Sequence, residues 1–200
     1  MLWIFITILA SLSQTLRSVS QKNIINEVGV VNSAYSRFIF ALPFSFLLLI
    51  FFIPYNDPIF LESIKPGTLS LLFLASICQI LFTVLLIKLF TLRSFAIGIA
   101  FSKTEVIQTT ILEILILGFI LTSQLFVAIL LGFVGVLFIS KLKLFSSLIE
   151  KKILTKQVII GVFCGIFLGL SSVLYKASLD NISGVFLYKK VITLSCFALL

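Results

Sequence analysis

Long apolar runs constrain this chain more than any other feature of its sequence. A helix needs about 20 mainly apolar residues to cross a bilayer. Six runs approach or exceed that length, at residues 2–19, 34–54, 68–88, 94–118, 124–140 and 158–177. A seventh begins near Ser183 and is still apolar at Leu200, so we expect the chain to be cut short. We predict an all-α polytopic membrane protein, a bundle of six complete transmembrane helices plus a partial seventh.

The composition favours a membrane protein over a soluble one. Hydrophobic residues make up 60% of the chain and charged residues 11%, whereas a soluble domain has about 45–50% and about 25%. A net charge of +8 would suit nucleic acid. The basic residues, however, lie mostly in short segments between apolar runs, as they do in membrane proteins. We therefore expect the lipid bilayer as a partner, and no nucleic acid.

The distribution of Lys and Arg predicts how the chain is oriented. Ten of these residues follow the first, third and fifth runs, whereas only Lys65 and Lys176 follow the second, fourth and sixth. Cytoplasmic loops are enriched in Lys and Arg. The count therefore places the N-terminus outside the cytoplasm.

Two short segments indicate an internal repeat. Residues 12–20 (LSQTLRSVS) are similar to residues 170–178 (LSSVLYKAS), five runs later. A repeat unit with an odd number of spans has inverted topology, as in many transporters. The predicted organisation is a first five-helix repeat at 1–140, a basic linker loop at 141–157, and the start of a second, incomplete repeat at 158–200.

Lys103 and Glu105 are ionisable residues in the middle of the fourth run. Each ionised group at the centre of a membrane helix costs about 2.5–3.5 kcal/mol. The two side chains point about 200° apart on a helix, so each needs a partner on another helix. Arg17 or Arg37 could pair with an acid. These charges form either structural ion pairs or a central site, where Lys103 binds an anionic group and Glu105 binds a cationic group or a proton.

The fourth run also carries a polar stripe at helical spacing, which includes Glu105, Gln108 and Glu113. In a substrate site, Gln108 would orient the ligand. Glu113 lies two turns beyond Glu105, about 12 Å along the axis. Glu113 could meet Lys103 only across a neighbouring protomer or a bent helix.

The first run presents a second polar face. Gln14, Arg17 and Gln21 are spaced i, i+3 and i+7 and share one side of a helix. In lipid, such a face must contact protein or water. It either lines a substrate path, with Gln14 the deeper residue, or belongs to a helix end where Arg17 reaches to the interface.

Single polar and small residues in the remaining runs have simple structural interpretations. Gln79 is a lone amide in the third run, and a hydrogen bond between helices would satisfy it without a substrate. Gly161, Gly165 and Gly169 repeat every four residues in the sixth run, which predicts close helix packing.

Nothing in the chain indicates an enzyme. Cys78, Cys164 and Cys196 lie inside apolar runs without metal-type spacing, and the chain has no His. Buried thiols explain them best. The motifs HExxH and GxSxG, the P-loop and the dinucleotide fingerprint do not occur. We therefore expect no catalysis, no metal and no cofactor.

Three runs carry a recognisable pattern. The second, SAYSRFIFALPFSFLLL, has the basic Arg37 and Pro43. The fourth is SFAIGIAFSKTEVIQTTILEILILG, and the fifth, FVAILLGFVGVLFIS, is rich in glycine, with Gly132 and Gly135. Together these runs resemble the second, fourth and fifth helices of the drug/metabolite transporter superfamily, in its EamA-type branch. The connection at 119–123 is short and predicts an antiparallel hairpin.

The resemblance implies a protein with ten spans in two inverted halves, usually with the N-terminus inside. It would be a multi-pass secondary transporter of the inner or plasma membrane that moves small polar metabolites by alternating access, with efflux as the direction. The pair Lys103 and Glu105 would suit amino acids or related zwitterions, and Glu105 would suit coupling to protons. Its substrate-path candidates are Gln14, Arg17, Arg37, Gln79, Lys103, Glu105, Gln108 and Glu113.

Two alternatives remain open at this point. The chain could be a non-transporting integral membrane protein or an inactive, truncated half-transporter. With the second repeat incomplete, a central site would lack one wall, and a homodimer could supply it.

Overall fold

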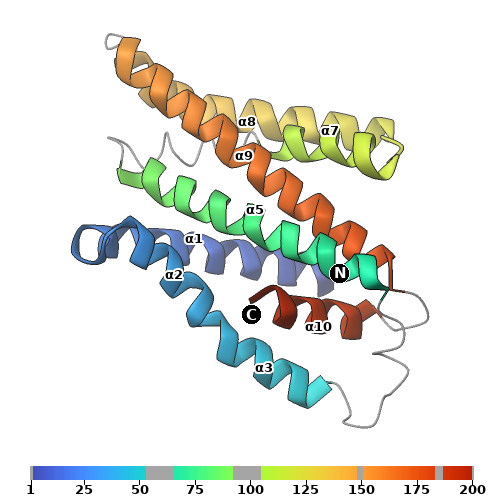
Figure 1. Ribbon diagram of the computed structural model, residues 1–200. Helices are drawn as coiled ribbons and strands as arrows, with labels where there is room; N and C mark the ends of the chain where they lie inside the picture. The colour runs from blue at the N-terminus through green and yellow to red at the C-terminus, as the bar shows by residue number, and fades with distance from the viewer. Residues whose placement is uncertain (1, 53–64, 92–104, 148–150, 183–186, 200) are drawn as a thin grey trace.

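The computed structural model describes residues 2–52, 65–91, 105–147, 151–182 and 187–199 (Figure 1). All regular structure in these residues is helical, which confirms the all-α prediction. The helices are α1 (Leu2–Val28), α2 (Val30–Ile39), α3 (Ala41–Phe52), α5 (Pro66–Thr91), α7 (Glu105–Leu117), α8 (Ser123–Ser147), α9 (Lys151–Asp180) and α10 (Leu187–Leu199).

Three stretches of the described residues are long and apolar enough to cross a membrane. They are Val30–Phe51, Gly67–Thr91 and Ile159–Asp180, and they match the second, third and sixth predicted runs. Ser123–Gly135 is a shorter apolar helix within the fifth run. The first and seventh runs are helical in α1 and α10, and α7 covers the second half of the fourth run.

Two glycines in the left-handed region of backbone conformation make the sharp turns. Gly29 has φ of 83° and Gly118 has φ of 64°, values that a residue with a Cβ adopts only with strain. The Gly29 N–H donates to the carbonyl of Ile25 at 2.9 Å, and the Gly118 N–H to that of Ile114 at 3.1 Å. Gly29, whose ψ of 168° is extended, ends α1, and Gly118 ends α7; at each glycine the chain reverses.

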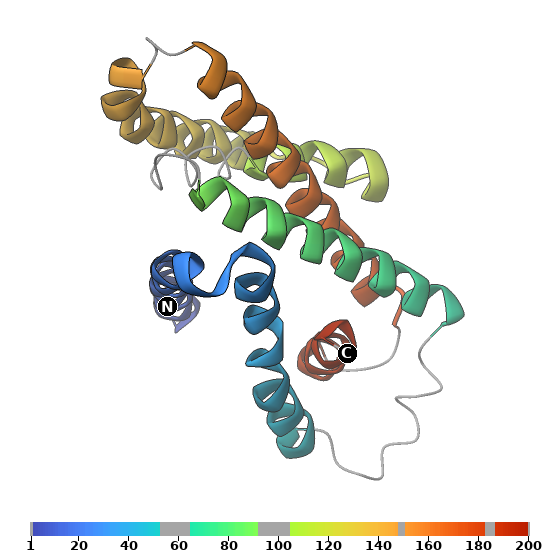
Figure 2. The same cartoon turned by 60° about the vertical axis from the view of Figure 1, so that its left-hand side comes forward.

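The resulting hairpins are α1–α2 and α7–α8. The second confirms the antiparallel pair predicted from the short connection at 119–123, and the two helices lie side by side in both views (Figures 1 and 2). The Thr122 hydroxyl accepts a 3.4 Å hydrogen bond from the Leu125 N–H and so caps α8. The connection in the first hairpin is shorter than the gap between the predicted runs at 2–19 and 34–54, because α1 continues through polar residues to Val28.

The second predicted span is one helix with a break. α2 ends at Ile39 and α3 begins at Ala41, with the junction at Phe40. Pro43 has no N–H to donate to the carbonyl of Ile39, and its ring crowds that carbonyl. The proline therefore explains the break, and the chain bends there in Figure 2.

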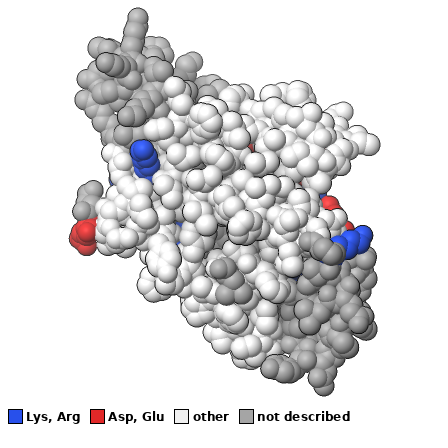
Figure 3. Space-filling model, in the orientation of Figure 1, with Lys and Arg blue, Asp and Glu red and all other residues white. Residues whose placement is uncertain are grey.

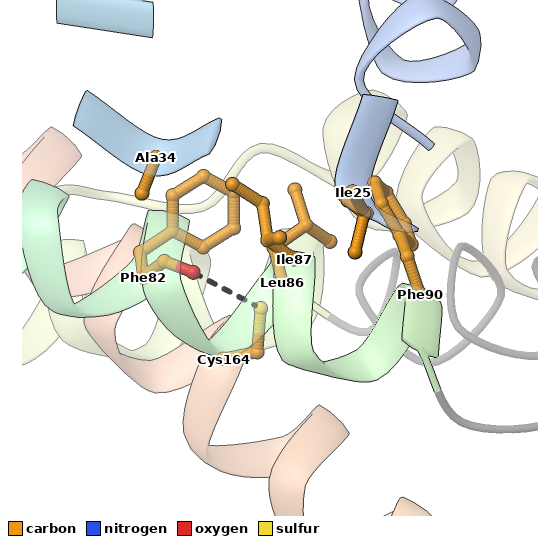
Figure 4. Close-up of a cluster of buried hydrophobic side chains, with 7 residues drawn as sticks. All are labelled: Ile25, Ala34, Phe82, Leu86, Ile87, Phe90 and Cys164. Atoms are coloured by element: carbon orange, nitrogen blue, oxygen red, sulfur yellow. Dashed lines mark hydrogen bonds between the residues drawn. The ribbon is translucent and has the colours of Figure 1, made fainter. Parts of the chain in front are cut away.

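α5 and α9 form the centre of the molecule. In both views α5 lies between α1 and α9, and α9 crosses it diagonally (Figures 1 and 2). α7 packs on α9, whereas α1, α2 and α10 pack on α5. Within the spans of α5 and α9, 39% of residues are buried, against 6% in Val30–Phe51. The main buried cluster joins four helices and consists of Ile25, Ala34, Phe82, Leu86, Ile87, Phe90 and Cys164 (Figure 4).

Apolar side chains cover the outside, and small polar ones are enclosed. On the face shown in Figure 3, the visible charged side chains lie mainly toward its two ends. Phe51, Phe73 and Leu115 are among the large apolar residues exposed at 70% or more. Ser171 and Thr83 are fully buried. This distribution suits a helix bundle surrounded by lipid, where the interior holds the polar groups.

The linker predicted as a loop at 141–157 is helical at both ends. α8 extends to Ser147 and α9 begins at Lys151. Polarity and positive charge do not end a helix, and the sequence has neither Gly nor Pro from 136 to 160. The division into two repeats remains a prediction.

Candidate functional site

The polar stripe of α7 faces α9 across glycines. A Cβ atom on Gly165 would collide with the side-chain oxygen of Gln108 and lie 3.3 Å from the Cα of Glu105. A Cβ on Gly169 would lie 2.9 Å from the Thr109 hydroxyl. A side chain at either position would press on α7, so the predicted close packing at Gly165 and Gly169 is confirmed.

Gln108 has an unsatisfied oxygen at this interface. Its Oε1 is buried and accepts no hydrogen bond from any described residue. A buried acceptor without a donor costs about 1–3 kcal/mol. Native structures satisfy nearly all such groups, so each exception needs an explanation such as a bound molecule. An N–H or O–H group of a ligand could satisfy the Gln108 oxygen; Gln21 Oε1, Ser45 Oγ and Thr68 Oγ1 are likewise buried without a partner among the described residues.

Gln79 approaches α9 from the opposite side and is satisfied. The Ser171 hydroxyl donates to Gln79 Oε1 at 2.8 Å. This bond joins α5 to α9 and is the helix-to-helix hydrogen bond that the sequence suggested as one interpretation of Gln79. Ser171 is one of three fully buried small residues on α9, with Cys164 and Ser178, at intervals of seven. This spacing was visible in the sequence and marks the side of α9 that packs on α5.

Arg37 and Glu105 both lie within electrostatic range of the buried Cys164. The Arg37 guanidinium lies 6.0 Å from the centre of the Phe82 ring, within cation–π range. The Cys164 thiol donates to the backbone carbonyl of Phe82 at 3.8 Å (Figure 4). Cys164 is close enough for electrostatic interaction with both Arg37 and Glu105. A cation from α2 and an anion from α7 thus approach the same buried point of α9.

Gln14 and Arg17 lie on α1 with exposed side chains. The structure brings neither to the interface of α7 with α9, because α5 lies between α1 and these helices (Figure 1). Gln21, one turn beyond Arg17, is buried and donates from Nε2 to the carbonyl of Ser33 at 3.3 Å. This face of α1 therefore contacts α2.

Glu113 forms an ion pair with Lys176, at the far end of α7. The Lys176 ammonium also lies 5.0 Å from the centre of the Phe119 ring. The sequence suggested Arg17, Arg37 or Lys103 as partners for an acid and did not identify Lys176. Glu113 is thus paired with Lys176 near the C-terminal end of α7, whereas Glu105 lies at the close contact of α7 with α9.

The chain matches one known family over most of its length. The model of the EamA-like transporter family covers residues 1–141. The chain belongs to the EamA-like transporter family. No curated protein and no solved structure matches it. As an EamA-like protein it is a multi-pass membrane protein of a transporter family rather than an enzyme, and its partners are the bilayer and a small-molecule substrate.

In this EamA-like protein, the matched region includes all eight predicted site residues, whereas α9 lies beyond it. The partners that the structure adds, Cys164, Ser171 and Lys176, all come from α9. Lys103 lies outside the described residues. Among those described, no group of three or more His, Cys, Asp or Glu side chains is placed to hold a metal ion.

Proposed function

We propose that this protein exports small polar metabolites, such as amino acids or related zwitterions, across the inner or plasma membrane by proton-coupled alternating access. Family membership supports transport in general. The observation that carries the finer proposal is the unsatisfied Gln108 oxygen, one turn from Glu105 at the glycine-lined contact of α7 with α9.

The proposed site complements both charges of a zwitterion. Arg37 would bind a carboxylate, and Glu105 would bind an ammonium group or carry the coupling proton. Gln108 would accept a hydrogen bond from the ligand and orient it. A buried carboxyl group is far less costly in a membrane when it is protonated. Binding or release of a proton at Glu105 would therefore change the relative free energies of the substrate-bound and substrate-free protein.

The remaining candidates have supporting roles in this proposal. Lys103 is a second anion-binding residue on the same run as Glu105. Gln14 and Arg17 would line the path on the α1 side, whereas Gln79 and Glu113 would hold α5 and α7 to α9 through Ser171 and Lys176.

The test is proton-coupled transport by the full-length protein in proteoliposomes. Currents would be recorded after rapid addition of L-alanine or L-glutamate over a range of pH. We expect Glu105→Gln to insert normally and lose the pH-dependent current. The control is Glu27→Gln, which removes an exposed acid at the end of α1. If Glu105→Gln transports at the wild-type rate with an unchanged pH profile, Glu105 does not carry the proton.

A further inference from the structure

The α1–α2 hairpin has a register that two contacts determine. The turn at Gly29 reverses the chain, and Gln21 donates to the carbonyl of Ser33 across the hairpin. α1 and α2 run antiparallel, so a step of one helical turn away from the tip of the hairpin moves four residues back along α1 and four residues forward along α2. One turn beyond Gln21 and Ser33, the facing positions are therefore Arg17 and Arg37.

The hairpin thus places two guanidinium groups at the same level. Arg37 and Arg17 are close enough to repel each other electrostatically. Arg37 is the eighth residue of the span Val30–Phe51, about 10 Å from its start. Neither arginine forms an ion pair with any other residue in the described parts of the chain.

The acids near this level do not balance the two cations. Glu105 approaches from α7 by way of Cys164 and contributes one negative charge. Glu27 is exposed near the tip of the hairpin, ten residues from Arg17, or about 15 Å along the helix. Among the described residues, Arg17, Arg37 and the exposed Lys22 of α1 therefore outnumber the single acid Glu105. In a low-dielectric region such an excess is costly unless an anion is bound.

We propose that Arg17 and Arg37 clamp an oxyanion group, carboxylate or phosphate, of the transported metabolite. This inference rests on the proposed function and makes its substrate class narrower: a small organic anion, with more acidic than amino groups, rather than a neutral zwitterion. Guanidinium groups suit this role because their planar N–H donors match the two oxygens of a carboxylate or phosphate.

A lipid phosphate has the same chemistry and could reach Arg17 from the exposed side of α1. The experiment must therefore separate a soluble anion from a headgroup. The full-length protein in nanodiscs of phosphatidylcholine would be titrated with succinate, inorganic phosphate or ethylammonium chloride at constant ionic strength. Its thermal stability would report binding.

We expect succinate, inorganic phosphate or both to stabilise the protein with a saturable dependence, and ethylammonium to have no such effect. Arg17→Gln and Arg37→Gln should each weaken anion binding by about tenfold or more, since a hydrogen bond to a charged group is lost. Arg37→Lys should be intermediate, because the charge remains and the planar fork is lost. Lys88→Gln removes an exposed positive charge from the end of α5 and should leave binding unchanged.

Two results would overturn the inference. One is anion binding that is equal in the wild type, Arg17→Gln and Arg37→Gln. The other is stabilisation by phosphatidylglycerol in the nanodisc but by neither soluble anion, which would assign the arginines to lipid. If a Glu105-dependent L-alanine current persists in both arginine variants, the anion clamp fails, whereas proton-coupled transport stands without a role for Arg37. Absence of any Glu105-dependent current with L-alanine, L-glutamate or succinate would instead contradict the proposed function.

Discussion

Gln79 and Gln108 reach α9 from opposite sides, and their amide oxygens differ in what they bind. Gln79 Oε1 accepts a hydrogen bond from Ser171 at 2.8 Å. Gln108 Oε1 is buried and accepts none from the described residues. The first amide serves the structure, because its polar group is satisfied within the bundle. The second retains a free acceptor, which a ligand could use.

The packing of the two interfaces differs in the same way. On the side toward α5, α9 contributes fully buried Cys164 and Ser171. On the other side, α7 has no residue in the buried class, although its backbone approaches Gly165 and Gly169 closely. Elements with fewer buried contacts open at lower free-energy cost. We therefore expect α5 and α9 to stay together during transport and α7 to move against them.

The largest effect should follow from filling the contact of α7 with α9. Gly165→Ile would force its side chain into Gln108 and the α7 backbone. Overpacking typically costs about 1–3 kcal/mol or more, so thermal stability should fall and transport should be lost. Gly132→Ile is the matched control, since nothing lies within 4 Å of a Cβ there. Equal losses in the two variants would show that Gly165 has no special role.

A smaller effect is expected at the satisfied amide. Ser171→Ala would leave Gln79 Oε1, on a half-buried side chain, without its donor, at a cost toward the lower end of about 1–3 kcal/mol. Thermal unfolding in detergent would measure the loss. Ser172→Ala is the control, because its hydroxyl is exposed and bonds only to the Leu168 carbonyl of the same helix. An unchanged melting temperature in Ser171→Ala would mean that the hydrogen bond between α5 and α9 contributes little.

The smallest effect should come from the ion pair at the end of α7. Lys176 is 45% exposed and Glu113 22% exposed, and exposed pairs of this kind contribute about 0.2–1 kcal/mol. A double-mutant cycle with Glu113→Gln and Lys176→Gln should give a coupling energy in that range. A coupling energy of several kcal/mol would instead show that this ion pair holds the end of α7 firmly against α9.

Much of the fold was predictable because the bilayer restricts a helix by length and polarity. Those constraints identified α5, α9 and the span formed by α2 and α3. The spacing of Gly165 and Gly169 predicted a close helix contact, which the structure forms with α7. Helix ends were less predictable. α1 continues to Val28 through polar residues, and the turn depends on a single residue, Gly29, in the left-handed conformation.

The partners of the site residues could not be predicted from spacing within one run. Glu113 and Lys176 are 63 residues apart, and Gln79 and Ser171 are 92 apart. Their contacts depend on how α9 crosses α5 and α7. The sequence indicated that Gln79 and Glu113 needed partners in lipid but did not identify them. Only the turn at Gly29 reveals that Arg17 and Arg37 occupy facing positions.

Cysteine labelling at the two glutamine positions tests the central difference most directly. Gln108→Cys and Gln79→Cys would be exposed in proteoliposomes to a charged, water-soluble thiosulfonate reagent, with the wild type as background for its three buried cysteines. We predict rapid labelling of Gln108→Cys, slowed by a transported substrate, and background labelling of Gln79→Cys. Equal labelling at both positions, or labelling of Gln79→Cys alone, would contradict the assignment of the α7 side of α9 to the substrate.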